Sequence, residues 1–167
     1  MENQQFVEEL KRRFNAYYDV YAPKVFGERE YDLYAHYFER NERYVASRKV
    51  VIYGIEQNEH VLYRYIDSDT VTEEDVAAFA SELEALVPQL VHPSSEHMAS
   101  LVVGCLGVKG AATKEAENFV RKYKYYKSFR FGFHGWVNIA LVLVDVHGTS
   151  KLISNRAGRK AKKKFHL

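Results

Sequence analysis

Carboxylate and imidazole side chains gather at two places in the chain. Glu56, Glu59 and His60 form one cluster, and Glu96 with His97 forms the other. Carboxylates and imidazoles together can hold a divalent metal ion or share acid–base catalysis. Both clusters fall where strands are expected to end, and sites often form where a rigid scaffold positions such segments. If the two strand ends converge, the five residues predict a catalytic or metal site. If they do not, these are solvated turn and helix-start side chains.

A basic and aromatic segment occupies residues 122–131. Its sequence, KYKYYKSFRF, places Lys122, Lys124 and Arg130 on one side of an extended chain and most of its rings on the other. A half-buried strand with a basic outer face has this pattern. It also suits nucleic acid, because bases stack on rings while Lys and Arg meet phosphates. Lys127 interrupts the alternation and requires an acidic partner if the aromatic side is buried.

Charge is divided unevenly along the chain. Residues 118–167 carry 12 Lys and Arg and a single acid, Asp145, whereas residues 1–117 carry 12 Lys and Arg and 21 acids. The end of the chain is a basic tail, whose cations are Arg156, Arg159, Lys160, Lys162, Lys163 and Lys164. Counterion release allows such a tail to bind nucleic acid or another polyanion without sequence preference. Alternatively, the tail keeps the protein in solution or folds back on the acidic part.

Composition places the chain among globular proteins, at 47% hydrophobic and 28% charged residues over 167 positions. The lone Cys105 excludes an intramolecular disulfide and a cysteine zinc site, and its apolar neighbours predict a buried thiol. The N-terminal residues do not resemble a signal peptide. The longest apolar run, residues 139–144, is far shorter than the roughly 20 residues that span a bilayer. We therefore expect a cytoplasmic protein with no membrane span and no cofactor.

Periodicity predicts the elements that position these residues. An apolar stripe at spacings of three and four predicts a helix up to Tyr21, before Pro23. Three strands follow at 31–38, 44–55 and 60–66, joined by turns at 40–42 and 57–59 into an antiparallel meander. Thr72 is expected to cap a helix that Pro88 kinks or ends. A buried strand at 99–108 and a helix at about 114–124 come next, and the last strands are expected at 129–134, 136–146 and 151–154.

The resulting order is α-βββ-α-β-α-βββ. It predicts one α+β domain over residues 1–155, with a mainly antiparallel sheet of about six strands and about three helices. Residues 156–167 are expected to form a basic tail that is mobile at its end. The order includes α-βββ-α-β, which resembles the core of the restriction-endonuclease-like nucleases. Those enzymes hold metal with an Asp/Glu-x-Lys triplet, and the predicted meander strands carry none.

Several short motifs are spread along the chain: Arg40-Asn41-Glu42, Glu56, Asn58-Glu59-His60, Glu96-His97-Met98, Lys127-Ser128-Phe129, Gly135-Trp136, Asn155 and Gly158. Together they resemble a small family of uncharacterised bacterial proteins, mostly from Firmicutes. The likeness spans nearly the whole chain and implies a bacterial cytoplasmic protein of unknown function, with no activity to transfer.

Three functions from different classes follow from these observations. The first, and preferred, is a non-enzymatic module that binds nucleic acid or another polyanion through the basic C-terminal third. The second is a metal-dependent, nuclease-like hydrolase that uses the Glu and His clusters. The third is a homodimeric module for protein contacts through an aromatic surface. The arrangement of the Glu and His clusters and of Lys127 in space discriminates among them.

Overall fold

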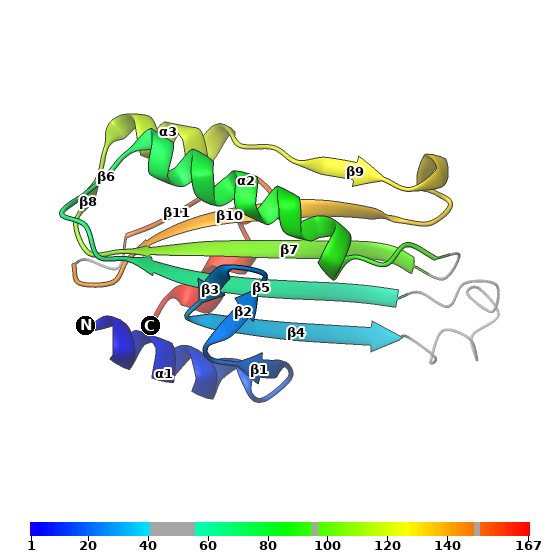
Figure 1. Ribbon diagram of the computed structural model, residues 1–167, viewed down its shortest axis with the longest axis horizontal. Helices are drawn as coiled ribbons and strands as arrows, with labels where there is room; N and C mark the ends of the chain where they lie inside the picture. Colours follow the sequence, from blue (N-terminus) through cyan, green and yellow to red (C-terminus); the bar gives the residue numbers. More distant parts are fainter. Residues whose placement is uncertain (41–55, 95–96, 149–150) are drawn as a thin grey trace.

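A mixed seven-stranded sheet forms the centre of the molecule (Figure 1). The structure, a computed structural model, describes residues 1–40, 56–94, 97–148 and 151–167. The strands lie in the order β1-β4-β5-β7-β10-β11, and β9 pairs with β10 beside β11. Their bounds are β1 Asp19–Tyr21, β4 Leu33–Arg40, β5 Glu56–Ile66, β7 His97–Val108, β9 Tyr126–Ser128, β10 Trp136–Asp145 and β11 Leu152–Ser154.

The two longest pairings of the sheet are parallel. β5 pairs with β7, and β7 pairs with β10, in parallel register, whereas the outer pairings are antiparallel. The expectation of a mainly antiparallel sheet is therefore wrong. The reason is the connections: α2 (Glu73–Leu90) joins β5 to β7, and α3 (Lys114–Lys122) joins β7 to β10. A helical crossover returns the chain to the same end of the sheet, so the strands that it joins run parallel.

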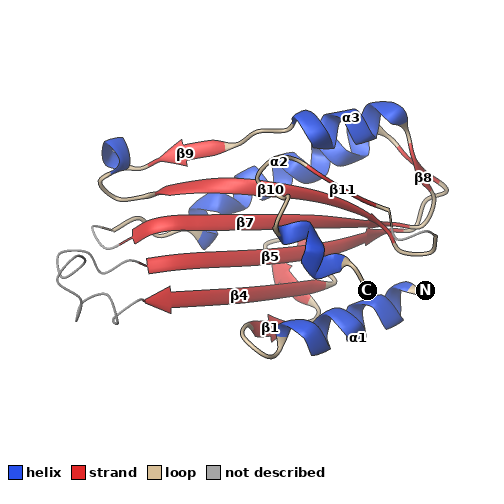
Figure 2. Cartoon of the chain, turned by 180° about the vertical axis from the view of Figure 1, so that it is seen from behind, coloured by secondary structure: helices blue, strands red, loops and turns tan. Residues whose placement is uncertain are grey.

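Helices cover both faces of the sheet, so the chain forms a single α+β domain with three α-helices among its described residues. α2 and α3 pack on one face, and α1 (Asn3–Phe14) packs on the other with the 3₁₀ helix η3 (Ala161–Phe165) (Figures 1 and 2). Alternate residues of β10 serve the two faces. Ile139 and Leu141 enter the core under α2 and α3, whereas Ala140 and Val142 enter the core under α1 and η3.

The helices begin and end close to the sequence signals. Thr72 caps α2, because its hydroxyl accepts from the backbone N–H of Asp75 while the Asp75 carboxylate accepts from the N–H of Thr72. α2 ends at Leu90, two residues after Pro88. α1 is shorter than expected: it ends at Phe14, and the chain continues through a turn into β1. The aromatic residues after Phe14 therefore belong to the turn and to β1.

Three short pieces complete the fold. β2 (Lys24–Phe26) and β3 (Arg29–Tyr31) form a hairpin whose turn uses Gly27 at positive φ. This hairpin packs on the α2 face, where the Tyr31 hydroxyl donates to Glu82 of α2 at 3.3 Å. β6 (Thr70–Val71) pairs with β8 (Ala111–Ala112), which ties the start of α2 to the start of α3.

Some predicted strands and turns differ from the structure. Residues 57–59, expected as a turn, lie inside β5, which pairs directly with β4. The predicted strand at 44–55 and most of the turn at 40–42 lie outside the described residues. The predicted strand at 129–134 is wrong: this stretch contains the 3₁₀ turn η2 (Arg130–Gly132), and strand structure is confined to β9 before it.

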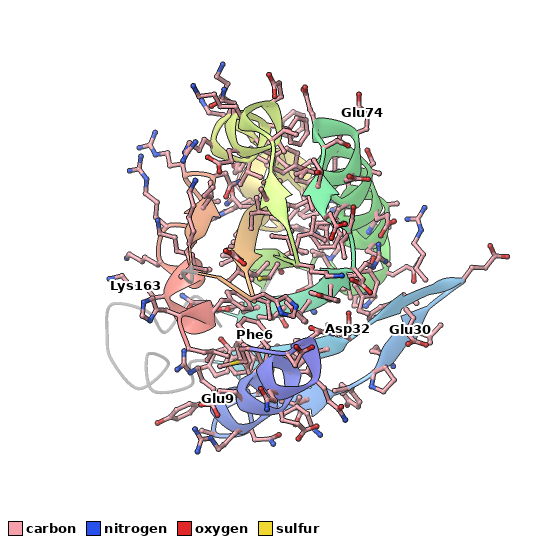
Figure 3. The ribbon with its side chains drawn as sticks, turned by 90° about the vertical axis from the view of Figure 1, so that its left-hand side faces the viewer. Phe6, Glu9, Glu30, Asp32, Glu74 and Lys163 are labelled. Atoms are coloured by element: carbon pink, nitrogen blue, oxygen red, sulfur yellow. The ribbon has the colours of Figure 1, made fainter. Side chains whose placement is uncertain are left out.

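The basic tail folds back onto the domain. Ala161 and Phe165 are buried, and the Phe165 ring lies 6.0 Å from that of Phe14 in α1. The Arg13 guanidinium donates to the carbonyl oxygens of Lys164 at 2.9 Å and His166 at 2.8 Å. In Figure 3, viewed along the strands, Lys163 of η3 and Glu74 of α2 lie on opposite sides of the sheet. The tail is thus part of the layer formed with α1.

Candidate functional site

The backbone brings the two predicted Glu and His clusters to neighbouring strands. Glu56 begins β5, His97 begins β7, and the two are register partners in the parallel pair, next to an irregularity between Glu56 and Gln57. Glu96 lies outside the described residues. The backbone of the two strand ends is therefore side by side.

Glu59 and His60 project to opposite faces of the sheet. The Glu59 carboxylate forms an ion pair with Lys164 of η3, whose ammonium also donates to the Tyr18 hydroxyl at 2.8 Å. His60 is buried on the α2 face, where its Nδ1 lies 2.8 Å from the Tyr34 hydroxyl. Consecutive residues of a strand alternate between faces, so these two do not meet. In the described part of the chain, no group of three or more His, Cys, Asp or Glu side chains could hold a metal ion.

The residues predicted to bind a polyanion are mostly exposed. Lys122 ends α3, Lys124 lies in the connection to β9, and Arg130 begins η2; all three are exposed. Within the described ranges, none of them forms an ion pair. Lys127 is exposed as well, with its ammonium 5.7 Å from the centre of the Phe129 ring. It therefore does not require the buried acidic partner considered from the sequence.

One of the tail cations forms an ion pair among the described residues. Lys164 is used in the fold through its pair with Glu59. The other tail cations have no ion pair with any residue that the structure describes, and they are Arg156, Arg159, Lys160, Lys162 and Lys163. Elsewhere in the C-terminal third, Lys151 and Arg121 both pair with Glu117. The acidic part of the chain thus neutralises only a few of the C-terminal cations.

A cavity of about 450 Å³ opens at the edge of the sheet, where β10 is flanked by β9 on one stretch and by β11 on another. Asn155 fills the gap between these two partners. Its Oδ1 accepts from the backbone N–H of Leu141 at 3.0 Å and of Gly158 at 2.9 Å. Its Nδ2 donates to the carbonyl oxygens of Ile139 at 2.9 Å and Tyr123 at 3.2 Å. One buried amide therefore fixes the walls of the cavity.

Aromatic and basic side chains line this cavity. Tyr123 and Tyr125 come from the connection between α3 and β9, Tyr126 begins β9, and Lys124 and Arg156 supply positive charge. The Tyr123 hydroxyl donates to Glu84 of α2 at 2.7 Å. Burial and the Glu84 carboxylate raise the pKa of Tyr123 well above its usual range, so this ring stays a neutral anchor. The segment is thus held rigidly while its cations remain in solvent.

Large rings are exposed just beyond the cavity. Tyr126 is 63% exposed, Phe133 is 80% exposed, and Phe131 is fully exposed. β9 runs beside the first residues of β10, and Figures 1 and 2 show that the short helix after β9 lies beyond the start of β10. Exposed apolar surface of this kind, beside charged residues, is typical of interaction sites.

The exposed rings are presented by a strained turn. Arg130 and Phe131 have positive φ values of 46° and 55°, which cost residues with side chains about 1–3 kcal/mol each. Backbone hydrogen bonds hold the turn, with the N–H of Gly132 donating to Phe129 at 3.0 Å and that of Phe133 to Arg130 at 3.0 Å. We name the edge formed by Lys122, Lys124, Tyr126, Lys127, Arg130, Phe131, Phe133 and Arg156 the basic–aromatic edge. Sequence reasoning missed the turn, although Gly132 and Gly135, both at positive φ, were a signal for it.

A family model described as "Domain of unknown function (DUF8052)" matches residues 2–167. The chain belongs to the DUF8052 family. This membership confirms the resemblance to a family of uncharacterised proteins, over nearly the whole chain. No curated protein and no solved structure has a significant match to this DUF8052 chain. In the described parts of the chain, no helix has the length and apolar character needed to cross a membrane.

Proposed function

We propose that this protein binds single-stranded nucleic acid along the basic–aromatic edge. The observation that carries the proposal is the presence, on one short segment, of three exposed rings and several cations that form no ion pair with described residues. Tyr126, Phe131 and Phe133 supply flat apolar surfaces, and Lys124 and Arg130 lie beside them without ion pairs among the described residues. Proteins that bind single strands combine aromatic stacking platforms with a positively charged path for the backbone.

The exposed rings favour a single strand over a duplex. In a duplex the bases are stacked on each other, and a protein meets mainly phosphates and groove edges. A single strand offers unstacked bases, and each base that stacks on a ring contributes about 1–3 kcal/mol. The cost of the strained turn at Arg130 and Phe131 is also consistent with a functional role, since strain in native proteins gathers at such sites. The cavity beside Tyr126 offers room for a base or a sugar.

Binding of a fluorescein-labelled oligothymidylate, followed by anisotropy over a salt series, tests this function. We expect saturable binding that weakens as salt rises, because each phosphate contact on a single strand adds about 0.7 to the salt slope. A duplex of matched length should bind more weakly at the same salt. Absence of binding at low salt would contradict the proposal.

Two pairs of substitutions localise the binding surface. Phe131→Ser with Phe133→Ser removes exposed rings and should weaken binding about tenfold or more without changing the thermal stability. Lys122→Gln with Lys124→Gln should reduce the salt slope by about 1.4. Lys162→Gln with Lys163→Gln is the matched control, because it removes the same charge from η3, away from β9 (Figure 2). Equal losses of affinity from the two lysine double variants would show that binding depends on net charge and not on the basic–aromatic edge.

The same rings also fit the homodimer considered from the sequence. Sedimentation of the free protein and of the Phe131→Ser, Phe133→Ser variant separates the two functions. A monomer that binds oligothymidylate supports the nucleic-acid function. A dimer that the two substitutions dissociate, without oligothymidylate binding by either protein, would support the protein-contact function in its place.

A further inference from the structure

A second cavity, of about 510 Å³, lies on the α2 face of the sheet. β4 and β5 form its floor, the β2–β3 hairpin supplies one wall, and the C-terminal end of α2 supplies another. Its volume falls in the range of about 300–1,000 Å³ that is typical of small-molecule sites. None of its lining residues belongs to the basic–aromatic edge.

Three histidines line this cavity. His36 and His60 are register partners on β4 and β5, and their rings stack with centroids 4.4 Å apart and planes 6° from parallel. His92 follows the C-terminus of α2. The Nε2 of His36 donates to Oδ1 of Asn58 at 3.1 Å, which fixes the orientation of the His36 ring.

His60 lines the cavity, and one of its ring nitrogens has no hydrogen-bond partner among the described residues. His60 is only 3% exposed, and its Nδ1 is satisfied by the Tyr34 hydroxyl. Its Nε2 is buried without a hydrogen-bond partner among the described residues. A buried polar group left unpaired costs about 1–3 kcal/mol, so such atoms in native proteins require an explanation. A ligand that supplies the missing hydrogen bond is one.

The charge of the cavity selects the kind of ligand. Lys24 lines it, with its ammonium 5.1 Å from the centre of the Tyr21 ring and 5.5 Å from that of Phe26. Among the described residues, Lys24 forms no ion pair and no carboxylate side chain lines the cavity. Aromatic rings, including Phe38, make up the rest of the wall near Lys24. In the part of the chain that the structure describes, the cavity therefore combines a lysine without an ion pair, imidazole nitrogens and flat apolar surfaces.

We propose that this cavity binds a small planar organic anion, a ring compound that carries a carboxylate or phosphate group. Lys24 pairs with the anionic group, and the aromatic wall packs against the ring. The Nε2 of His60 makes the remaining hydrogen bond. Three imidazoles could instead suggest a metal ion, but no group of three or more His, Cys, Asp or Glu side chains in the described residues has a suitable arrangement.

NMR titration of the full chain tests this site, with the imidazole signals of His36 and His60 as the readout. The probes are benzoate and phenyl phosphate, with neutral benzamide and inorganic phosphate as comparisons. We expect benzoate or phenyl phosphate to shift both imidazole signals saturably. Benzamide lacks the charge and inorganic phosphate lacks the ring, so each should bind at least about tenfold more weakly.

Two lysine variants separate binding in the cavity from general attraction to a basic protein. Lys24→Met should weaken binding of the ring anion about tenfold or more and leave thermal stability unchanged, since Lys24 makes no ion pair in the described chain. Lys114→Met, at the start of α3, removes the same charge from an exposed position and should leave binding unchanged. The proposal is overturned if neither ring anion shifts the imidazole signals at millimolar concentration, if benzamide binds as tightly as benzoate, or if the two variants behave alike.

Discussion

His36 and His60 face each other across the antiparallel pair of β4 and β5, with ring centroids 4.4 Å apart. The stack extends to Tyr34, whose hydroxyl lies 2.8 Å from Nδ1 of His60. Because His60 is buried, a charge on its ring would be poorly solvated and would lie directly against a second imidazole. The arrangement therefore holds His60 in its neutral form.

Protonation of His60 should make stability depend on pH in the acidic range. Burial lowers the pKa of His60 to about 3 from 6.5, with a smaller contribution in the same direction from His36 and His92. Between these two values the unfolded chain binds a proton that the folded chain does not. Stability should thus be complete above pH 6.5 and fall as the pH decreases towards 3, with a slope of up to about 1.4 kcal/mol per pH unit from this group.

Urea unfolding at a series of pH values measures this effect against the slope that the carboxylates contribute. His60→Gln should flatten the profile between pH 6 and pH 4, because Gln has no proton to bind. His166→Gln is the matched control, since His166 is exposed, and it should leave the profile unchanged. Parallel profiles for the native protein and His60→Gln would show that His60 titrates normally in the folded state.

Asn155 should be among the most important polar residues for stability. Its amide makes four hydrogen bonds that join β10, the α3–β9 connection and the turn at Gly158. Asn155→Ala leaves buried backbone groups unpaired, so we expect a loss of roughly 2–4 kcal/mol. The exposed Asn118→Ala on α3 should change stability by about 0.5 kcal/mol or less. Urea midpoints at constant m-value measure the stability of both variants. Equal losses for Asn155→Ala and Asn118→Ala would contradict the role assigned to Asn155.

The sequence predicted the helices and the buried strands better than the way the strands pair. The hydroxyls of Thr72 and Thr113 accept hydrogen bonds from backbone N–H groups in the first turns of α2 and α3. These caps depend on residues close in sequence, so both helices begin where the sequence predicts. The parallel pairing was also available from the sequence, since a strand–helix–strand succession requires a crossover. The prediction failed because alternating patterns were interpreted as a meander, and the turn expected at residues 57–59 lies inside β5.

The candidate sites were harder to predict for physical reasons. Consecutive side chains of a strand point to opposite faces of the sheet, so Glu59 and His60 lie on opposite faces although they are adjacent in sequence. The three histidines of the α2-face cavity come from β4, β5 and the end of α2, and no local motif joins them. The basic segment was recognised because its residues are contiguous. Its exposed rings were not, because the turn at Phe131 depends on backbone conformation.

The C-terminal tail should contribute to stability through Phe165 and not through the charges of Lys162 and Lys163. Phe165 is buried against α1, so Phe165→Ala should cost about 3–5 kcal/mol. Lys162→Gln with Lys163→Gln should change stability by about 0.5 kcal/mol or less. Thermal unfolding of both variants measures the difference. Removal of residues 161–167 is therefore unsuited to testing polyanion binding, and a truncated chain as stable as the full one would contradict this role of Phe165.

Gly104 on β7 allows α2 to approach the sheet closely, and a double-mutant cycle can measure this contact. A Cβ atom at position 104 would lie 2.1 Å from Cδ1 of Leu83, a fully buried residue of α2. Gly104→Ala alone should cost about 1–3 kcal/mol through overpacking, and Leu83→Ala alone about 2–5 kcal/mol through a cavity. In the double variant the new methyl group occupies part of that cavity, so the combined loss should be smaller than the sum by about 1 kcal/mol or more.

Leu10→Ala in α1, on the other face of the sheet, is the matched control for this cycle, and its effect on stability should add to that of Gly104→Ala without coupling. Additive losses for Gly104 with Leu83 would show that α2 moves away from the sheet at little cost, and equal coupling to Leu10 would show a general loss of the native structure.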